Sequence, residues 1–204
     1  MAKIVVFAQQ KGGAGKTTLL VQTAVAMAAR GCTLALVDLD PQRSLTRWAE
    51  IRNDPEIPVD AAADWQAGAA LRKAARAAGH VLVDCPGNAD ILLRAAVRQA
   101  DLVVIPCQPS PMDAWATGAT LEMCAREKTR AVIVLNRVPP RGGAMEETLR
   151  LLAESGADIS PAALGARVAY STAFLQGRAA SEVSPRSRAA QEVGALAEDL
   201  MSRL

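Results

Sequence analysis

Five short apolar runs, separated by long alanine-rich stretches, are the feature that most constrains the fold of this chain. The runs are IVVFA (4–8), LALVDLD (34–40), HVLVD (80–84), LVVIP (102–106) and AVIVLN (131–136). Hydrophobicity without polar alternation is typical of strands buried on both faces of a parallel sheet. Stretches with helical spacing lie between and after them, at about 16–30, 65–78, 89–99, 112–127, 144–155 and 189–204. The alternation predicts the α/β class: a wound, mostly parallel sheet flanked by helices.

Composition is consistent with one domain of this kind over residues 1–204. Half of the 204 residues are hydrophobic but only 3% are aromatic, so the core is expected to be aliphatic. The four cysteines show no spacing typical of a zinc site or a redox pair, which favours reduced thiols in a cytoplasmic protein. No signal peptide and no apolar run long enough to span a membrane is visible. The net charge of +2 does not by itself indicate nucleic acid.

A glycine-rich loop, QQKGGAGKTT, occupies residues 9 to 18, between the first expected strand and the first expected helix. Its backbone N–H groups and the positive end of the helix dipole are suited to surround phosphate oxygens. We expect Lys16 to reach the β- and γ-phosphates, Thr17 to bind Mg²⁺ and Thr18 to contact the α-phosphate. The predicted ATP-binding residues of this loop are Gly12, Gly13, Ala14, Gly15, Lys16, Thr17 and Thr18.

Aspartates stand at the ends of two of the apolar runs. Asp38 and Asp40 are two residues apart, which predicts that both lie on the same side of a strand and face the γ-phosphate. Asp84 ends HVLVD and has the position of a Walker B aspartate that holds the Mg²⁺ shell. An aspartate at a strand end can instead cap the following helix, and this alternative stays open.

A second lysine, Lys11, directly precedes Gly12, and the resulting KGGAGKT resembles the signature of the deviant Walker A ATPases. These include the ParA partition proteins, MinD and the nitrogenase iron protein. The resemblance covers nearly the whole chain and is closest to the small ParF-like partition ATPases, through DPQRSLTRW (40–48) and IPCQPSPMD (105–113). A lysine at the outer edge of the loop can reach the phosphates of a partner subunit in a face-to-face dimer. The alternative is a solvated surface lysine.

The resemblance implies a role for each motif residue. It assigns catalysis to Lys11, Lys16 and Asp40, with Asp40 positioning the attacking water. It assigns the Mg²⁺ site to Thr17, Asp38 and Asp84. Asn136 and Arg137, which close the fifth apolar run, are expected to contact adenine.

The same resemblance implies a slow ATPase that needs ATP and Mg²⁺ and becomes a homodimer when ATP binds. In that state it would bind nonspecific double-stranded DNA on the nucleoid. A ParB- or ParG-like partner, or a cargo adaptor, would stimulate hydrolysis, and the cycle would segregate a plasmid, chromosome or protein cluster. Because the glycine-rich loop begins ten residues from the start, we expect no N-terminal helix-turn-helix domain of the kind found in larger partition proteins.

Arginines between residues 160 and 190 are the candidate DNA contacts. They are Arg167, Arg178, Arg186 and Arg188. Glu182 is the only acid in this segment, so its local charge balance is plus three in a chain whose net charge is +2. A solvated arginine-rich face without DNA is the alternative.

Two other functions of the same loop stay open. A MinD-like spatial regulator needs a basic amphipathic helix at its C-terminus to bind membrane, whereas residues 189–204 contain three acids against one arginine. No membrane binding is therefore expected. A metabolic P-loop ligase of the dethiobiotin-synthase type usually lacks Lys11 and should show substrate-binding residues, which we do not find in the sequence.

Overall fold

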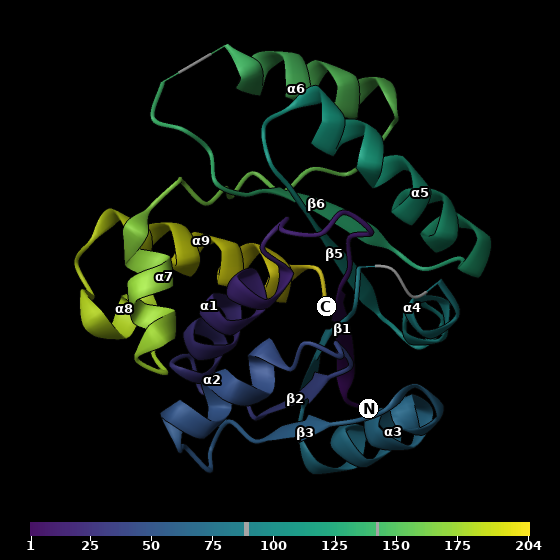
Figure 1. The fold of residues 1–204 in the computed structure, drawn as a ribbon, viewed down its shortest axis with the longest axis vertical. Helices are drawn as coiled ribbons and strands as arrows, with labels where there is room; N and C mark the ends of the chain where they lie inside the picture. Colours follow the sequence, from purple (N-terminus) through teal and green to yellow (C-terminus); the bar gives the residue numbers. More distant parts are fainter. Residues whose placement is uncertain (88–89, 142) are drawn as a thin grey trace.

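A single parallel sheet organises the chain, as the computed structural model in Figure 1 shows for residues 1–87, 90–141 and 143–204. The six strands have the order β3-β2-β4-β1-β5-β6, and every pair of neighbours is parallel. They are β1 (Lys3–Phe7), β2 (Leu34–Asp38), β3 (Val59–Ala61), β4 (His80–Asp84), β5 (Leu102–Cys107) and β6 (Ala131–Leu135). The predicted wound α/β sheet is confirmed.

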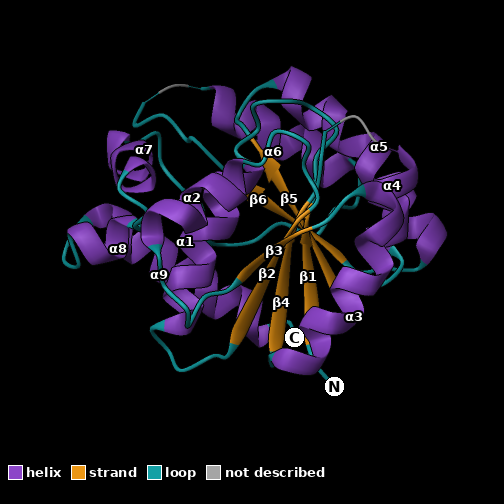
Figure 2. Ribbon diagram, turned by 60° about the horizontal axis from the view of Figure 1, so that its bottom comes forward, coloured by secondary structure: helices purple, strands orange, loops and turns teal. Residues whose placement is uncertain are grey.

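Helices cover both faces of the sheet (Figure 2). They are α1 (Lys16–Ala28), α2 (Ser44–Arg52), α3 (Ala67–Ala77), α4 (Asp90–Val97), α5 (Pro111–Glu127), α6 (Ala144–Glu154), α7 (Val168–Leu175), α8 (Ala180–Val183) and α9 (Arg188–Ser202). The first hydrophobic core lies between the sheet and α1, α2 and α7 to α9, and the second lies between the sheet and α3 to α6. This arrangement divides the molecule into three layers.

The pleat of the strands distributes their side chains between the two cores. Val5 and Phe7 belong to the first core, whereas Val6 and Ala8 belong to the second, because successive side chains point to opposite faces. Helix α9 packs on α1 and buries Val193, Leu196, Ala197 and Leu200, as its spacing predicts. Burial on both faces explains why the strands have no polar alternation.

Elements without an apolar run were not predicted. The edge strand β3 has only three residues, and none of them is fully buried. Helices α2, α7 and α8 are also additional to the sequence prediction. Strand β2 ends at Asp38, so Asp40 lies in the following loop and the pleat does not determine where it points. The expectation that both aspartates share one side of a strand was therefore wrong.

The carboxyl ends of the strands form the edge at which the predicted site residues meet. The glycine-rich loop follows β1, Asp38 ends β2, and Asp84 ends β4. Asn136 directly follows β6 at the same edge. Ligands of open α/β sheets bind at this edge, because the loops that leave the parallel strands converge there.

Candidate nucleotide-binding site

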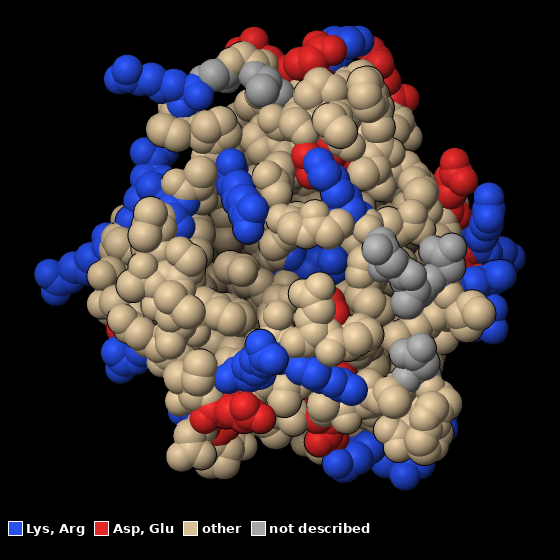
Figure 3. Space-filling model, viewed as in Figure 1, with Lys and Arg blue, Asp and Glu red and all other residues tan. Residues whose placement is uncertain are grey.

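A cavity of about 480 Å³ opens where the glycine-rich loop meets the start of α1. Figure 3 shows the molecule hollowed near the centre of this face. The lining residues are Gly12, Gly13, Gly15, Lys16, Thr17, Thr18, Asp40, Pro41, Gln42, Ser44, Pro86, Gly87, Arg137 and Phe174. The structure thus brings together the predicted loop, Asp40 and Arg137 around one open space.

The glycine-rich loop is held in place by Asn136, which directly follows β6, two strands away from β1 in the sheet. Asn136 Nδ2 donates a hydrogen bond of 2.9 Å to the carbonyl of Ala14. Gly15 precedes α1 with a φ of 91°, and a Cβ atom at Gly15 would lie 2.4 Å from Asn136 Nδ2. Glycine is therefore required at this position both for its backbone conformation and for the close approach. Contact of Asn136 with adenine stays a prediction, since its amide here supports the loop.

Lys16 and Thr17 occupy the first turn of α1, where backbone amides are available to an anion. Lys16 is 8% exposed, and its Nζ donates to the carbonyl of Gln9 at 3.2 Å. Thr17 Oγ1 donates to Asp84 Oδ2 at 2.6 Å. The hydroxyl from the first turn of α1 and the carboxylate from the end of β4 are therefore neighbours, as a shared Mg²⁺ site requires.

Asp84 is completely buried, and its Oδ1 has no hydrogen-bond partner among the described residues. Burial raises the pKa of this carboxyl to about 7, although the hydrogen bond from Thr17 opposes the rise. An unpaired buried carboxylate oxygen beside a hydroxyl suits a hard cation. Mg²⁺ takes one or two protein oxygens and keeps water or phosphate oxygens as its other ligands. Thr17 and Asp84 fit that description.

Asp38 and Asp40 have different surroundings. Asp38 is fully buried; its Oδ1 accepts from the amide of Asp40 at 3.0 Å, and its Oδ2 accepts from Thr46 N and Oγ1 at 2.9 and 2.7 Å. It therefore shapes the loop and anchors the start of α2. Asp40 lines the cavity, and its Oδ1 accepts from the amide of Gln42 at 2.9 Å. The metal-supporting role of Asp38 stays a prediction.

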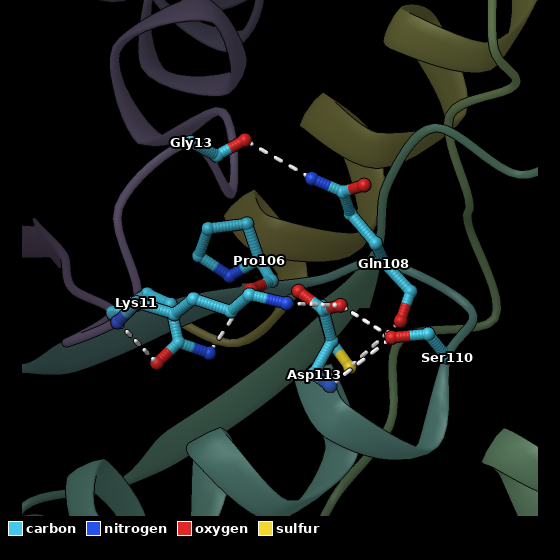
Figure 4. Close-up of polar contacts among 8 residues, drawn as sticks. Lys11, Gly13, Pro106, Gln108, Ser110 and Asp113 are labelled. Carbon is cyan, nitrogen blue, oxygen red and sulfur yellow. Dashed lines mark hydrogen bonds and ion pairs between the residues drawn. The ribbon is translucent and has the colours of Figure 1, made fainter.

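Lys11 does not line the cavity but extends toward the start of α5 (Figure 4). Its Nζ lies 2.7 Å from Asp113 Oδ2, and the hydroxyl of Ser110 donates to the same oxygen. Gln108 Nε2 donates to the carbonyl of Gly13 at 3.0 Å. The segment between β5 and α5 therefore holds the outer side of the glycine-rich loop.

Residues 5–179 match the family model described as the CobQ/CobB/MinD/ParA nucleotide binding domain. The chain belongs to this family. Maintenance of carboxysome distribution protein A of Halothiobacillus neapolitanus is 32% identical over 197 residues, which cover 91% of this chain and 89% of the relative. Protein ParA of Rhizobium radiobacter is 34% identical over 185 residues, with 85% and 83% coverage.

Solved structures show the same MinD/ParA fold. The cell division ATPase MinD of Pyrococcus furiosus superposes with a TM-score of 0.81 at 18% identity, over 100% of both chains. The ATP complex of a Cyanothece McdA variant superposes with a TM-score of 0.80 at 16% identity, over 99% of this chain and 96% of that one. At these identities the similarity establishes the fold.

Phe174 is a cavity residue of this MinD/ParA domain that sequence reasoning missed. It lies on α7, a helix with no predicted counterpart, and lines the cavity together with Ser44 from α2. Neither residue belongs to a recognisable phosphate-binding pattern. Only the packing of α7 against α1 and α2 brings Phe174 to the nucleotide site.

The predicted DNA contacts differ in how much charge they expose. Arg167 makes two hydrogen bonds to Glu192, at 2.8 and 2.6 Å, and Tyr170 donates to the same carboxylate at 2.8 Å. Arg188 lies 3.7 Å from Glu192 as well. Because Glu192 lies just beyond residue 190, the local excess of three positive charges is an overestimate. The Arg167 guanidinium is largely compensated within the chain.

Arg178 and Arg186 are exposed and make no salt bridge within the described ranges. Figure 3 shows Lys and Arg side chains along the edge of the molecule formed by α7 and α8, with few acidic side chains among them in this view. Of the four candidate arginines, Arg178 and Arg186 therefore expose uncompensated charge, whereas Arg167 and Arg188 lie beside Glu192.

Proposed function

We propose that this chain is a Mg²⁺-dependent ATPase that dimerises on binding ATP and positions a cargo through the dimer. The observation that carries the proposal is the opposite placement of two lysines in one phosphate loop. Lys16 lines the cavity, whereas Lys11 leaves the cavity and pairs with Asp113. Lys16 then serves the phosphates of its own subunit, and Lys11 serves those of the partner. In its observed position Lys11 does not serve the phosphates of its own subunit.

Hydrolysis in this proposal depends on electrostatic positioning. The amides of the glycine-rich loop and Lys16 hold the β- and γ-phosphates, and Thr17 and Asp84 hold Mg²⁺. The metal, when bound, neutralises charge on the phosphate oxygens. Asp40 faces the cavity from the loop after β2 and orients the attacking water. No group in this set forms a covalent bond to the phosphate, which agrees with a slow ATPase.

Dimerisation exchanges one charge-assisted contact of Lys11 for another. In the single chain Lys11 is paired with a carboxylate that is 5% exposed. A triphosphate presented by a second subunit offers more negative charge than Asp113 does, so the lysine transfers to it. ADP offers less charge at that end, and the dimer then dissociates. This difference makes the association depend on the nucleotide.

Nonspecific double-stranded DNA is the proposed track, with Arg178, Arg186 and Arg188 as contacts. Doubling these arginines in the dimer raises the affinity in the ATP state. A ParB-like or cargo-adaptor partner would stimulate hydrolysis. One relative is named for carboxysome distribution and another is named ParA, and both names support a role in positioning a cargo, whether a protein assembly or DNA.

The MinD-like alternative is less well supported by the packing of α9. Its apolar residues Val193, Leu196 and Leu200 lie fully buried in the first core, so a membrane anchor made from this helix would have to leave that core. None of the helices in the described part of the chain combines the length and hydropathy that a membrane span requires.

Phosphate release with ATP and Mg²⁺ tests the proposal. Lys16→Ala should abolish hydrolysis, and Asp40→Ala should lower it strongly, because the first removes charge from the phosphates and the second misplaces the water. Lys73→Ala is a suitable control, since that lysine side chain is 74% exposed on α3. Undiminished turnover in a clean Lys16→Ala preparation would refute the assignment.

A further inference from the structure

Arg43 has an unusual backbone conformation directly beside the candidate site. It precedes α2 with φ 56° and ψ 33°, in the left-handed region. Residues with a Cβ atom rarely adopt this region, because Cβ crowds the next carbonyl oxygen. Asn53 and Lys128 share the conformation but end helices, where it is common. At Arg43 the conformation opens a helix instead, so other contacts must stabilise it.

The Arg43 guanidinium supplies such contacts by joining the ends of two strands. Nη1 donates to the carbonyl of Asp38 at 2.8 Å, and Nη2 donates to the carbonyl of Ala62 at 3.2 Å. The amide of Ala62 in turn donates to the Asp38 carbonyl at 3.0 Å. Asp38 ends β2, and Ala62 directly follows the edge strand β3. The rigid planar fork of arginine is suited to bind two acceptors at once.

These bonds fix the loop on a side that does not line the cavity. Gln42 and Ser44 line the cavity, but Arg43 between them does not. The amide of Arg43 donates to the carbonyl of Asp40 at 2.9 Å, and the amide of Gln42 donates to the Asp40 carboxylate. Asp40 is therefore held in a tight turn, one end of which is attached to the sheet edge by the Arg43 side chain.

We propose that Arg43 is a positioning residue for hydrolysis. Arg43 attaches the loop of residues 39–43 to the ends of β2 and β3. The Asp40 side chain is thereby kept in the orientation that it needs to position the attacking water. The inference rests on the proposed role of Asp40 in hydrolysis. Since Arg43 is absent from the cavity lining, its loss changes the rate of the chemical step rather than the binding of ATP.

Three substitutions at this position separate the side chain from the backbone. Arg43→Gly removes the guanidinium but adopts the left-handed conformation readily, so the loop can still form. Arg43→Ala removes the side chain and keeps the backbone strain, and Arg43→Lys keeps a charge that can reach one carbonyl. Arg47→Ala is the matched control, because Arg47 is exposed one turn further along α2. Thermal unfolding checks that each variant is folded.

Steady-state ATP hydrolysis of the full chain gives the deciding readout. For Arg43→Gly we expect kcat to fall about tenfold and KM to stay within about twofold, with an intermediate kcat for Arg43→Lys. Arg47→Ala should match the unsubstituted protein. Unchanged kcat in Arg43→Gly, or a rise in KM that accounts for the whole loss, would overturn the proposal.

A second measurement keeps this inference separate from the proposed function. Hydrogen exchange of the amides of residues 39, 40 and 42–46 reports the order of the loop without any turnover. We expect faster exchange in Arg43→Gly than in Arg47→Ala, and equal rates would contradict the attachment of the loop. If Asp40→Ala hydrolyses ATP normally while exchange responds as expected, the role of Asp40 fails but the attachment by Arg43 stands.

Discussion

Lys11 Nζ lies 2.7 Å from Asp113 Oδ2, although 102 positions separate the two residues in the chain. The pair connects the glycine-rich loop to the first turn of α5. The Asp113 carboxylate is 5% exposed and also accepts a hydrogen bond from Ser110. A contact of this kind is less screened by solvent than an ordinary surface pair. Lys11 must therefore leave a bound position before it can reach a partner subunit.

Lys11→Ala is expected to prevent ATP-dependent dimerisation while ATP binding by the monomer is largely retained. Asp113→Asn should have the opposite effect, because a neutral amide competes less well for the lysine. We expect the dimer to form at about threefold to tenfold lower concentration, which corresponds to about 1 kcal/mol. Sedimentation velocity with a nonhydrolysable ATP analogue measures both. Normal dimerisation of Lys11→Ala would show that the lysine does not act across the interface.

Combined substitution of Arg178→Glu and Arg186→Glu should weaken DNA binding in the ATP state on every sequence tested. It should also lower the salt dependence by about one unit of slope for each phosphate that an arginine no longer neutralises. Arg167→Ala should have a smaller effect, since its guanidinium is bound to Glu192 and is less available to a phosphate. Fluorescence anisotropy with ATP, with ADP and without nucleotide provides the comparison. Equal and weak binding in all three states would exclude DNA as the track.

Gly177→Ala should destabilise the fold by about 2–4 kcal/mol. Gly177 has a φ of 66°, and a Cβ atom there would lie 2.5 Å from the backbone nitrogen of Arg52. Gly156→Ala is the control: its φ is 70°, but nothing lies within 4 Å of an added Cβ, so only the backbone strain of about 1 kcal/mol is expected. Chemical denaturation measures both free energies of unfolding. Equal destabilisation would mean that close packing of α2 against the turn after α7 contributes nothing.

Glu182→Gln tests the ion pair that attaches α8 to α2. Burial opposes ionisation of Glu182, but hydrogen bonds from Arg52 and from the amide of Ala179 outweigh it and keep its pKa below the ordinary 4.5. The folded state therefore releases this proton at lower pH than the unfolded state, and the stabilisation is present above about pH 4.5 and lost as the pH falls further. We expect a loss of about 2 kcal/mol at neutral pH that shrinks as the pH falls below about 4.5. A loss independent of pH would indicate a steric cause.

Local sequence patterns were sufficient to predict most of the fold and the phosphate loop. Buried strands and a glycine-rich turn before a helix each require particular residue types at consecutive positions. The strands at 4–8 and 102–106 and the loop at 9–18 could therefore be predicted from the sequence. Helix α7 could not, because it exposes Val168 and Leu175 while it buries Tyr170 and Ala173, which weakens any periodic signal. Phe174 was missed with it.

Five of the six strands, the family resemblance and both lysines of the phosphate loop could be predicted from the sequence alone. The tertiary structure was needed to show which carboxylate each lysine or arginine side chain pairs with. Lys11 pairs with Asp113 from the first turn of α5, and Arg167 is compensated by Glu192, 25 residues further along. The physical reason is that short-range patterns record backbone conformation, whereas charge pairing depends on distances between elements that only the packed sheet and helices set.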